Sequence, residues 1–157
     1  MNKLDVRMVR LDDMRVASVR VVSESPEAEA LGKLLAWAES RGLLAGTERN
    51  PVYGFNNPNP SPGEKEYGYE FWIKVDRDAE PEGDIVVKDF AGGLYAVTTC
   101  RLTGDPQGNV MEVWQHLLNW VRESPYDWRR THELERLRDP YAAERDAVLD
   151  LYLPVEG

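Results

Sequence analysis

The sequence predicts an α+β fold made of two similar halves, each a β-β-α-β-β-like unit, packed with pseudo-two-fold symmetry around a central groove. Two segments with helical periodicity are each flanked by short stretches rich in β-branched and aromatic residues. Adding 80 to the residue number carries every predicted element of the first half onto one of the second, as Pro26 onto Pro106, without a gap. We therefore expect a single domain over residues 1–157, with an internal duplication whose repeats span about residues 4–75 and 84–155.

The first half opens with a predicted β-hairpin. Residues 5–11 alternate weakly, Asp12 and Asp13 supply a short polar turn, and residues 14–22 are rich in valine. This order of strand, turn and strand is the usual signature of two consecutive strands that pair.

An amphipathic helix follows, from Ser25 to near Gly42. Ser25 is a capping residue, and Pro26 suits the first helical position. The apolar positions recur at i, i+3, i+4 and i+7: Leu31, Leu34, Leu35 and Ala38. The half then ends with strands at residues 51–55 and 67–75, separated by a loop rich in Asn, Pro and Gly at residues 56–63.

The second half repeats this order. Residues 84–90 and 94–102 predict another hairpin around the turn Ala91-Gly92-Gly93. Asp105-Pro106 opens a second helix, which Ser124-Pro125 ends. Its wide apolar stripe consists of Val110, Val113, Trp114, Leu117, Leu118 and Val121. Strands are expected at residues 131–137 and 148–155.

Composition and charge argue against several classes of protein. No apolar run is long enough to span a bilayer and no secretory signal opens the chain, so we expect a cytoplasmic protein without membrane contact. The net charge of −9 repels phosphate backbones and disfavours direct binding of nucleic acid. The single cysteine, Cys100, excludes an internal disulfide and fits a reducing compartment.

Signatures of cofactor and metal chemistry are missing from the sequence. It has no phosphate-binding loop, no nucleophile elbow, no paired-cysteine motif and no histidine pair at ligand spacing. We therefore predict neither a cofactor nor a metal.

Carboxylates beside aromatic residues are the strongest candidates for a binding site. Period two in residues 69–73 places Glu70 and Trp72 on one face of a strand, and Asp150 and Tyr152 share a face in the same way. An acid beside an aromatic wall suits an organic cation or the protonation of a leaving group. The alternative is a solvated face of the sheet.

Glu135 is the third candidate acid. Alternation in residues 132–137 places it on one side with Glu133 and Leu137. If this side is buried among aromatic residues, the pKa of Glu135 rises and the carboxyl can act as an acid or base. If the side is exposed, Glu135 pairs with Arg136 or Arg138, and the residues alone leave both possibilities open.

Several stretches together resemble the gyrase-inhibitor-like family of small-molecule-binding proteins. These are YGFNNPNP at residues 53–60, YEFWIKV at 69–75, Leu134-Glu135, and LDLYLPV at 149–155. The family is related to the effector-binding domains of AraC-type and MerR-type multidrug-responsive regulators. The chain departs from those regulators because no helix-turn-helix segment precedes Asp5, so we do not expect a complete transcription factor.

The resemblance implies an aromatic groove between the halves that accepts drug-like, often cationic molecules around an acidic residue, whose position Glu135 matches. Glu70 is a second acid of the expected site. The aromatic walls would then be Tyr53, Phe55, Trp72, Trp114 and Tyr152. Some relatives hydrolyse strained cyclopropane rings, which would make Glu135 the residue that orients or deprotonates water.

Three functions follow as hypotheses. The first is a stand-alone binding protein for a small, amphipathic or cationic organic ligand. The second is a hydrolase of strained-ring or electrophilic natural products that uses Glu135 to activate water, and the third is a protein-interaction inhibitor of a topoisomerase. Only the resemblance selects Glu135 over Glu70 and Asp150.

Overall fold

The computed structural model describes residues 5–44, 49–101, 106–139 and 147–157, and it confirms the α+β class. The elements are β1 (Arg7–Leu11), β2 (Met14–Ser23), α1 (Pro26–Ser40), β3 (Val52–Asn56), β4 (Tyr67–Val75), β5 (Val86–Phe90), β6 (Gly93–Arg101), α2 (Pro106–Glu123), β7 (Asp127–Trp128), β8 (Leu134–Leu137) and β9 (Val148–Glu156). Of the predicted boundaries, Leu102 and Asp105 lie outside the described residues. The short strand β7 was not predicted, because two residues carry no periodic signal.

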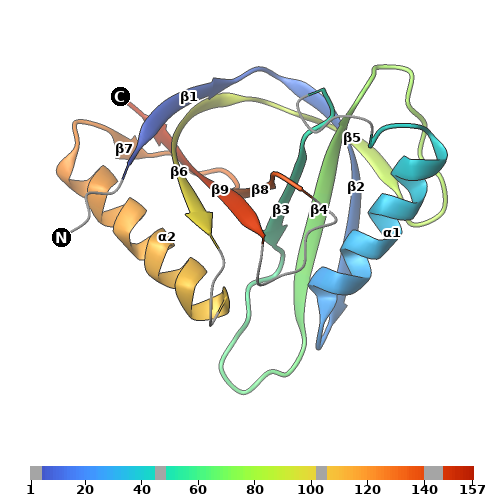
Figure 1. Cartoon of the computed structure of the whole chain (residues 1–157), viewed down its shortest axis with the longest axis horizontal. Coiled ribbons are helices and arrows are strands. Elements are labelled where there is room, and N and C mark those ends of the chain that lie inside the picture. The colour runs from blue at the N-terminus through green and yellow to red at the C-terminus, as the bar shows by residue number, and fades with distance from the viewer. Residues whose placement is uncertain (1–4, 45–48, 102–105, 140–146) are drawn as a thin grey trace. The chain divides into compact units, whose positions relative to one another are not determined.

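The chain divides into two compact units: unit 1 consists of residues 1–13 and 91–157, and unit 2 of residues 14–90. The strands of unit 2 pair antiparallel in the order β5-β2-β4-β3. Helix α1 packs against β2 and β4 (Figure 1) and buries Leu34, Trp37 and Ala38. The predicted stripe of this helix therefore covers one face of the sheet strands that belong to unit 2.

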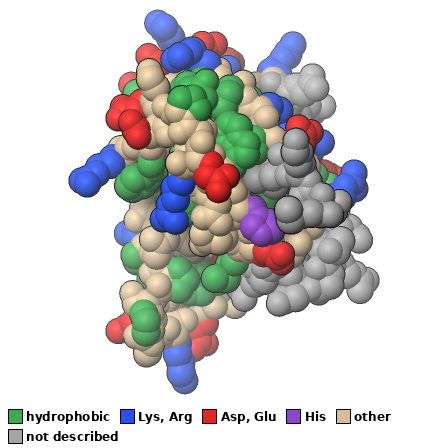
Figure 2. All heavy atoms as spheres, turned by 90° about the vertical axis from the view of Figure 1, so that its left-hand side faces the viewer, with side chains coloured by type: hydrophobic (Ala, Val, Ile, Leu, Met, Phe, Trp, Pro, Cys, Tyr) green, Lys and Arg blue, Asp and Glu red, His purple; other side chains and the backbone are tan. Residues whose placement is uncertain are grey.

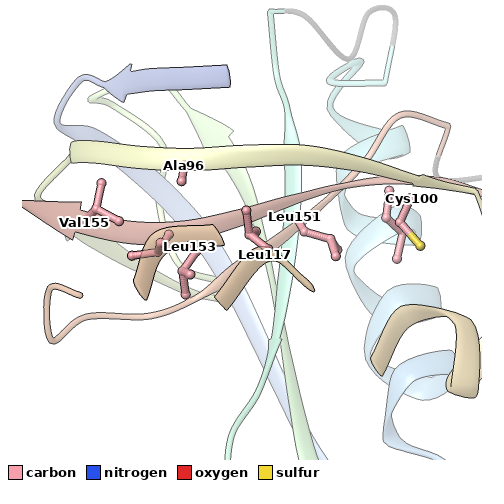
Figure 3. Packing of buried hydrophobic residues seen from close by; sticks show 8 residues of the cluster. Ala96, Cys100, Leu117, Leu151, Leu153 and Val155 are labelled. Atoms are coloured by element: carbon pink, nitrogen blue, oxygen red, sulfur yellow. The ribbon is translucent and has the colours of Figure 1, made fainter. Parts of the chain in front are cut away.

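Unit 1 has strands in the order β1-β6-β9-β8, also antiparallel, and β7 pairs with the end of β9. Helix α2 packs against β6 and β9. Apolar side chains from these three elements form one buried cluster (Figure 3): Ala96, Cys100, Leu117, Val121, Leu149, Leu151, Leu153 and Val155. Neither helix of the described ranges is long and apolar enough to cross a membrane.

The two predicted hairpins are wrong. Strand β1 pairs with β6, from Arg7 opposite Val97 to Leu11 opposite Gly93, while β2 pairs with β4 on one edge and β5 on the other. Residues 12–13 and 91–92 therefore carry the chain from one unit to the other instead of reversing it within a unit. A polar turn composition is compatible with both courses, so the local sequence did not distinguish them.

The residues that link the units explain one glycine. In unit 1 the Gly92 amide donates to Oδ1 of Asp13 at 2.8 Å. A Cβ atom added at Gly92 would lie 1.9 Å from the carbonyl oxygen of Leu11, which is far inside van der Waals contact. Gly92 is therefore required by the close approach of two backbone segments and not by a hairpin turn.

A second close approach fixes the loop that joins β3 to β4. The Asn57 amide donates to the Gly68 carbonyl at 2.9 Å, and the Gly68 amide donates to the Pro58 carbonyl at 2.9 Å. A Cβ atom at Gly68 would lie 1.8 Å from the carbonyl oxygen of Asn57. The loop thus returns the chain through a backbone contact that only glycine allows.

Candidate functional site

In unit 2, Glu70 and Trp72 lie on the face of the sheet opposite α1. The phenol of Tyr67 donates to Glu27 of α1 at 2.8 Å, which places the odd-numbered residues of β4 on the helix side. Tyr53 pairs with Trp72 and Phe55 with Glu70 across β3 and β4, and directly paired residues point to the same side. The structure thus brings together four of the predicted site residues.

Glu70 is 3% exposed as a residue, and its carboxylate is held by four donors. Oε2 accepts from Ser18 Oγ at 2.6 Å and from the Trp72 indole at 2.6 Å, and it forms an ion pair with Lys88. Oε1 accepts from the side-chain amide of Asn57 at 3.0 Å. Burial alone would raise the pKa of Glu70, but the hydrogen bonds from Lys88, Ser18, Trp72 and Asn57 outweigh it and lower the pKa to about 2.

This lowered pKa predicts a loss of stability in acid. Because the folded pKa of Glu70 lies below its ordinary value of 4.5, its contribution is complete above pH 4.5 and is lost as the pH falls through about 2. Between these limits we expect the free energy of unfolding of the wild type to fall by roughly 3 kcal/mol more than that of Glu70→Gln. Denaturant unfolding at several pH values measures the difference, and parallel pH profiles of the two proteins would contradict it.

Unit 1 holds a comparable carboxylate at Asp150, which is 4% exposed. It accepts from Arg138 Nε at 3.0 Å and Nη2 at 2.9 Å, from Thr99 Oγ1 at 2.8 Å, and pairs with Arg7 at 3.1 Å. Burial raises the pKa of Asp150, but the hydrogen bonds from Arg138, Thr99 and Arg7 lower this pKa by a larger amount. The pKa of Asp150 is therefore below its ordinary value. This carboxylate is already neutralised by two arginines of the chain.

Glu135 lies on the other side of the unit 1 sheet, the side that faces α2. It pairs with Leu151 across β8 and β9, and Leu151 belongs to the cluster packed against α2. Its side chain is half-buried. Burial and the negative charge of Glu135 together raise the pKa of the Cys100 thiol, which lies in the same cluster, to about 11. The negative charge of Glu135 therefore acts on a group inside the apolar layer beneath α2.

Trp114 is on the same side of unit 1. It is half-buried in α2 and packs against the apolar cluster, as does Leu137 of β8. Tyr152 is on the opposite side with Asp150, where its ring meets that of Tyr95 at a centroid distance of 5.7 Å. Within unit 1, Glu135 and Trp114 therefore lie on one side of the sheet and Tyr152 lies on the other.

A known protein family matches almost the whole chain. A family model described as integron-associated effector binding protein (Cass2) matches residues 7–155. The chain belongs to this family. The resemblance to gyrase-inhibitor-like effector-binding proteins drawn from the sequence is thereby confirmed. No curated protein matches the chain significantly.

Solved structures share the fold of this effector-binding protein at low identity. The EcmrR C-terminal domain has a TM-score of 0.70 and 16% identity, with 98% of each chain covered, while the protein spans 57% of the EcmrR chain in its complex with DNA. SAV2435 bound to tetraphenylphosphonium has a TM-score of 0.59 and 12% identity, covering 98% and 95% of the two chains. A hydrolase from Listeria innocua has a TM-score of 0.69 and 9% identity, covering 99% and 94%.

The sequence did not predict which side chains of the protein hold the two buried carboxylates. Lys88 of β5 and Ser18 of β2 reach Glu70, and Arg7 of β1 reaches Asp150, each from a strand other than the one that holds the carboxylate. The alternation of residues within one strand cannot show these partners, because each contact depends on which strands pair. The sequence offers Arg138 as a possible partner of Glu135, and in the structure Arg138 pairs with Asp150.

Apolar side chains also reach the surface of the effector-binding protein. On the face shown in Figure 2 they lie between acidic and basic groups. Met111 of α2 is 71% exposed and Trp128 of β7 is 49% exposed. Scattered exposed apolar residues of this kind are normal and do not by themselves mark a site.

Proposed function

We propose that the protein binds a small amphipathic organic cation and that Glu135 supplies the negative charge of the site. The observation that carries this proposal is the position of Glu135, half-buried on the α2 side of unit 1, the side on which the apolar cluster and Trp114 lie. A carboxylate at the margin of an apolar layer attracts a ligand that has both a charge and a hydrophobic body. The resemblance to the effector-binding family, whose acidic position Glu135 matches, selects Glu135 over Glu70 and Asp150 for this role.

The comparisons support a small-molecule ligand. The family is one of effector-binding proteins, and the structurally similar SAV2435 was solved with tetraphenylphosphonium. That molecule is a lipophilic cation, which makes it a suitable first probe for this protein as well.

A fluorescence titration tests the proposal. Tetraphenylphosphonium should quench the tryptophan emission of the wild type. Glu135→Gln should weaken its binding by roughly tenfold or more, since two opposite charges about 6 Å apart at an effective dielectric constant of about 20 attract each other by roughly 2–3 kcal/mol. Glu112→Gln, an exposed position of α2, serves as the control and should bind like the wild type. Equal affinity of the Glu135 and Glu112 variants would refute the role of Glu135.

Hydrolysis is the second candidate function, favoured by the shared fold of the Listeria innocua hydrolase. Glu135 would then accept a proton from the attacking water. Release of product from an electrophilic ester or strained ring must exceed the buffer rate and fall in Glu135→Gln. The topoisomerase-inhibitor hypothesis stays a prediction.

An internal duplication of the fold is a further part of the proposal. It is supported by the matching pairing orders, β5-β2-β4-β3 with α1 and β1-β6-β9-β8 with α2. Glu70 and Asp150 are separated by 80 residues, and each is a buried carboxylate with a lowered pKa.

A further inference from the structure

Lys88 places its ammonium group in an acid and aromatic site of unit 2. The nitrogen pairs with the Glu70 carboxylate and lies 5.3 Å from the centroid of the Trp72 ring. Phe90 and Phe55 flank that ring at centroid distances of 4.8 and 4.9 Å. These are the components that proteins use to hold an organic cation: a carboxylate, an indole face and a rim of aromatic rings.

We propose that Lys88 is a tethered occupant of an organic-cation site, and that small primary ammonium ions bind Glu70 and Trp72 when the lysine side chain withdraws. Lys88 thereby determines which cations reach the site. This second site lies in unit 2 and is independent of the function proposed for Glu135 in unit 1.

The anion would remain in place without the lysine. Ser18, Asn57 and the Trp72 indole still donate to the carboxylate, and they favour its charged form. A buried carboxylate that is hydrogen-bonded but lacks a counter-ion is strongly unfavourable. A small ammonium ion would restore the missing charge and the missing contact with the ring.

Lys88 is also able to leave. The side chain of Glu70 is 4% exposed, whereas that of Lys88 is 42% exposed. Strand β5 ends the sheet of unit 2, so the lysine stem can turn into solvent without disturbing a further strand of that unit. A tethered group competes at an effective concentration on the order of millimolar, which keeps dilute ammonium ions out of the wild type.

Chemical rescue tests the proposal. Lys88→Ala removes three carbons and the nitrogen, which n-propylammonium replaces. Propylammonium chloride should raise the melting temperature of Lys88→Ala by about 3 °C or more over sodium chloride at the same concentration, as expected for ligand in about tenfold excess over Kd. The wild type, Lys88→Arg, and the control Lys33→Ala, which removes an exposed ion pair with Asp84, should respond equally to both salts.

Equal effects of the two salts on Lys88→Ala would overturn the proposal. So would a propylammonium effect that persists when Glu70→Gln is added to Lys88→Ala. If Lys88→Ala does not fold in sodium chloride, refolding is compared in the two salts: recovery in propylammonium alone supports the site, and no recovery in either overturns it. The rescue should survive Glu135→Gln, so failure here and failure of the tetraphenylphosphonium titration are separate outcomes.

Discussion

Replacing Glu70 with alanine is expected to lower the free energy of unfolding by about 3 kcal/mol or more. The substitution leaves Lys88 without its counter-ion, and the buried Trp72 indole and Ser18 hydroxyl without their acceptor. Unpaired buried donors carry their full desolvation cost, so the loss exceeds the net value of the hydrogen bonds themselves. Urea or guanidinium unfolding at neutral pH measures it.

The matched control is Glu66→Ala, an exposed glutamate in the same part of the chain. We expect it to change the free energy of unfolding by less than about 0.5 kcal/mol. If Glu70→Ala proves as mild as Glu66→Ala, the Glu70 network does not stabilise unit 2.

Gly68→Ala should be comparably damaging, for a different reason. The new methyl would lie 1.8 Å from the Asn57 carbonyl oxygen, and neither group is the end of a flexible side chain. The backbone must shift, which breaks the hydrogen bonds that Gly68 makes with Asn57 and Pro58. We expect a loss on the order of 3 kcal/mol, measured as a lowered midpoint of denaturant unfolding.

Gly32→Ala provides the opposite outcome as a control. Gly32 is exposed in α1 and a Cβ atom there meets nothing within 4 Å. Alanine is favoured over glycine in a helix by about 1 kcal/mol, so this variant should be more stable than the wild type. Similar losses for both glycines would show that the contact at Gly68 is not the cause.

Periodicity predicted the elements well, because each depends on residues close in the sequence. Both helices begin at the predicted proline, and β4 spans the predicted residues 67–75. The hairpin predictions were wrong because a strand can pair with a strand that is far away in the sequence, and local sequence does not show which strands pair. Asp12 and Asp13 fit a turn equally well whether the next strand returns beside the first or enters the other unit.

The same distinction separates what could be predicted of the site. Period two correctly placed Glu70 and Trp72 on one face, since both belong to one strand. Their charge balance was not predictable, because Lys88 comes from β5. The side on which Glu135 lies required the register of β8 on β9, and the groove expected between the halves stays a prediction.

In the sequence, unit 2 lies between the two segments of unit 1, and this order affects how the chain folds during synthesis. All the strands of unit 2 have been made once Phe90 is complete, whereas β1 was made first and waits for β6, which begins at Gly93. At about 5–20 residues per second, the ribosome leaves β1 without its partner for several seconds. The growing chain therefore completes unit 2 first, and β1, although made before every strand of unit 2, is paired only after them.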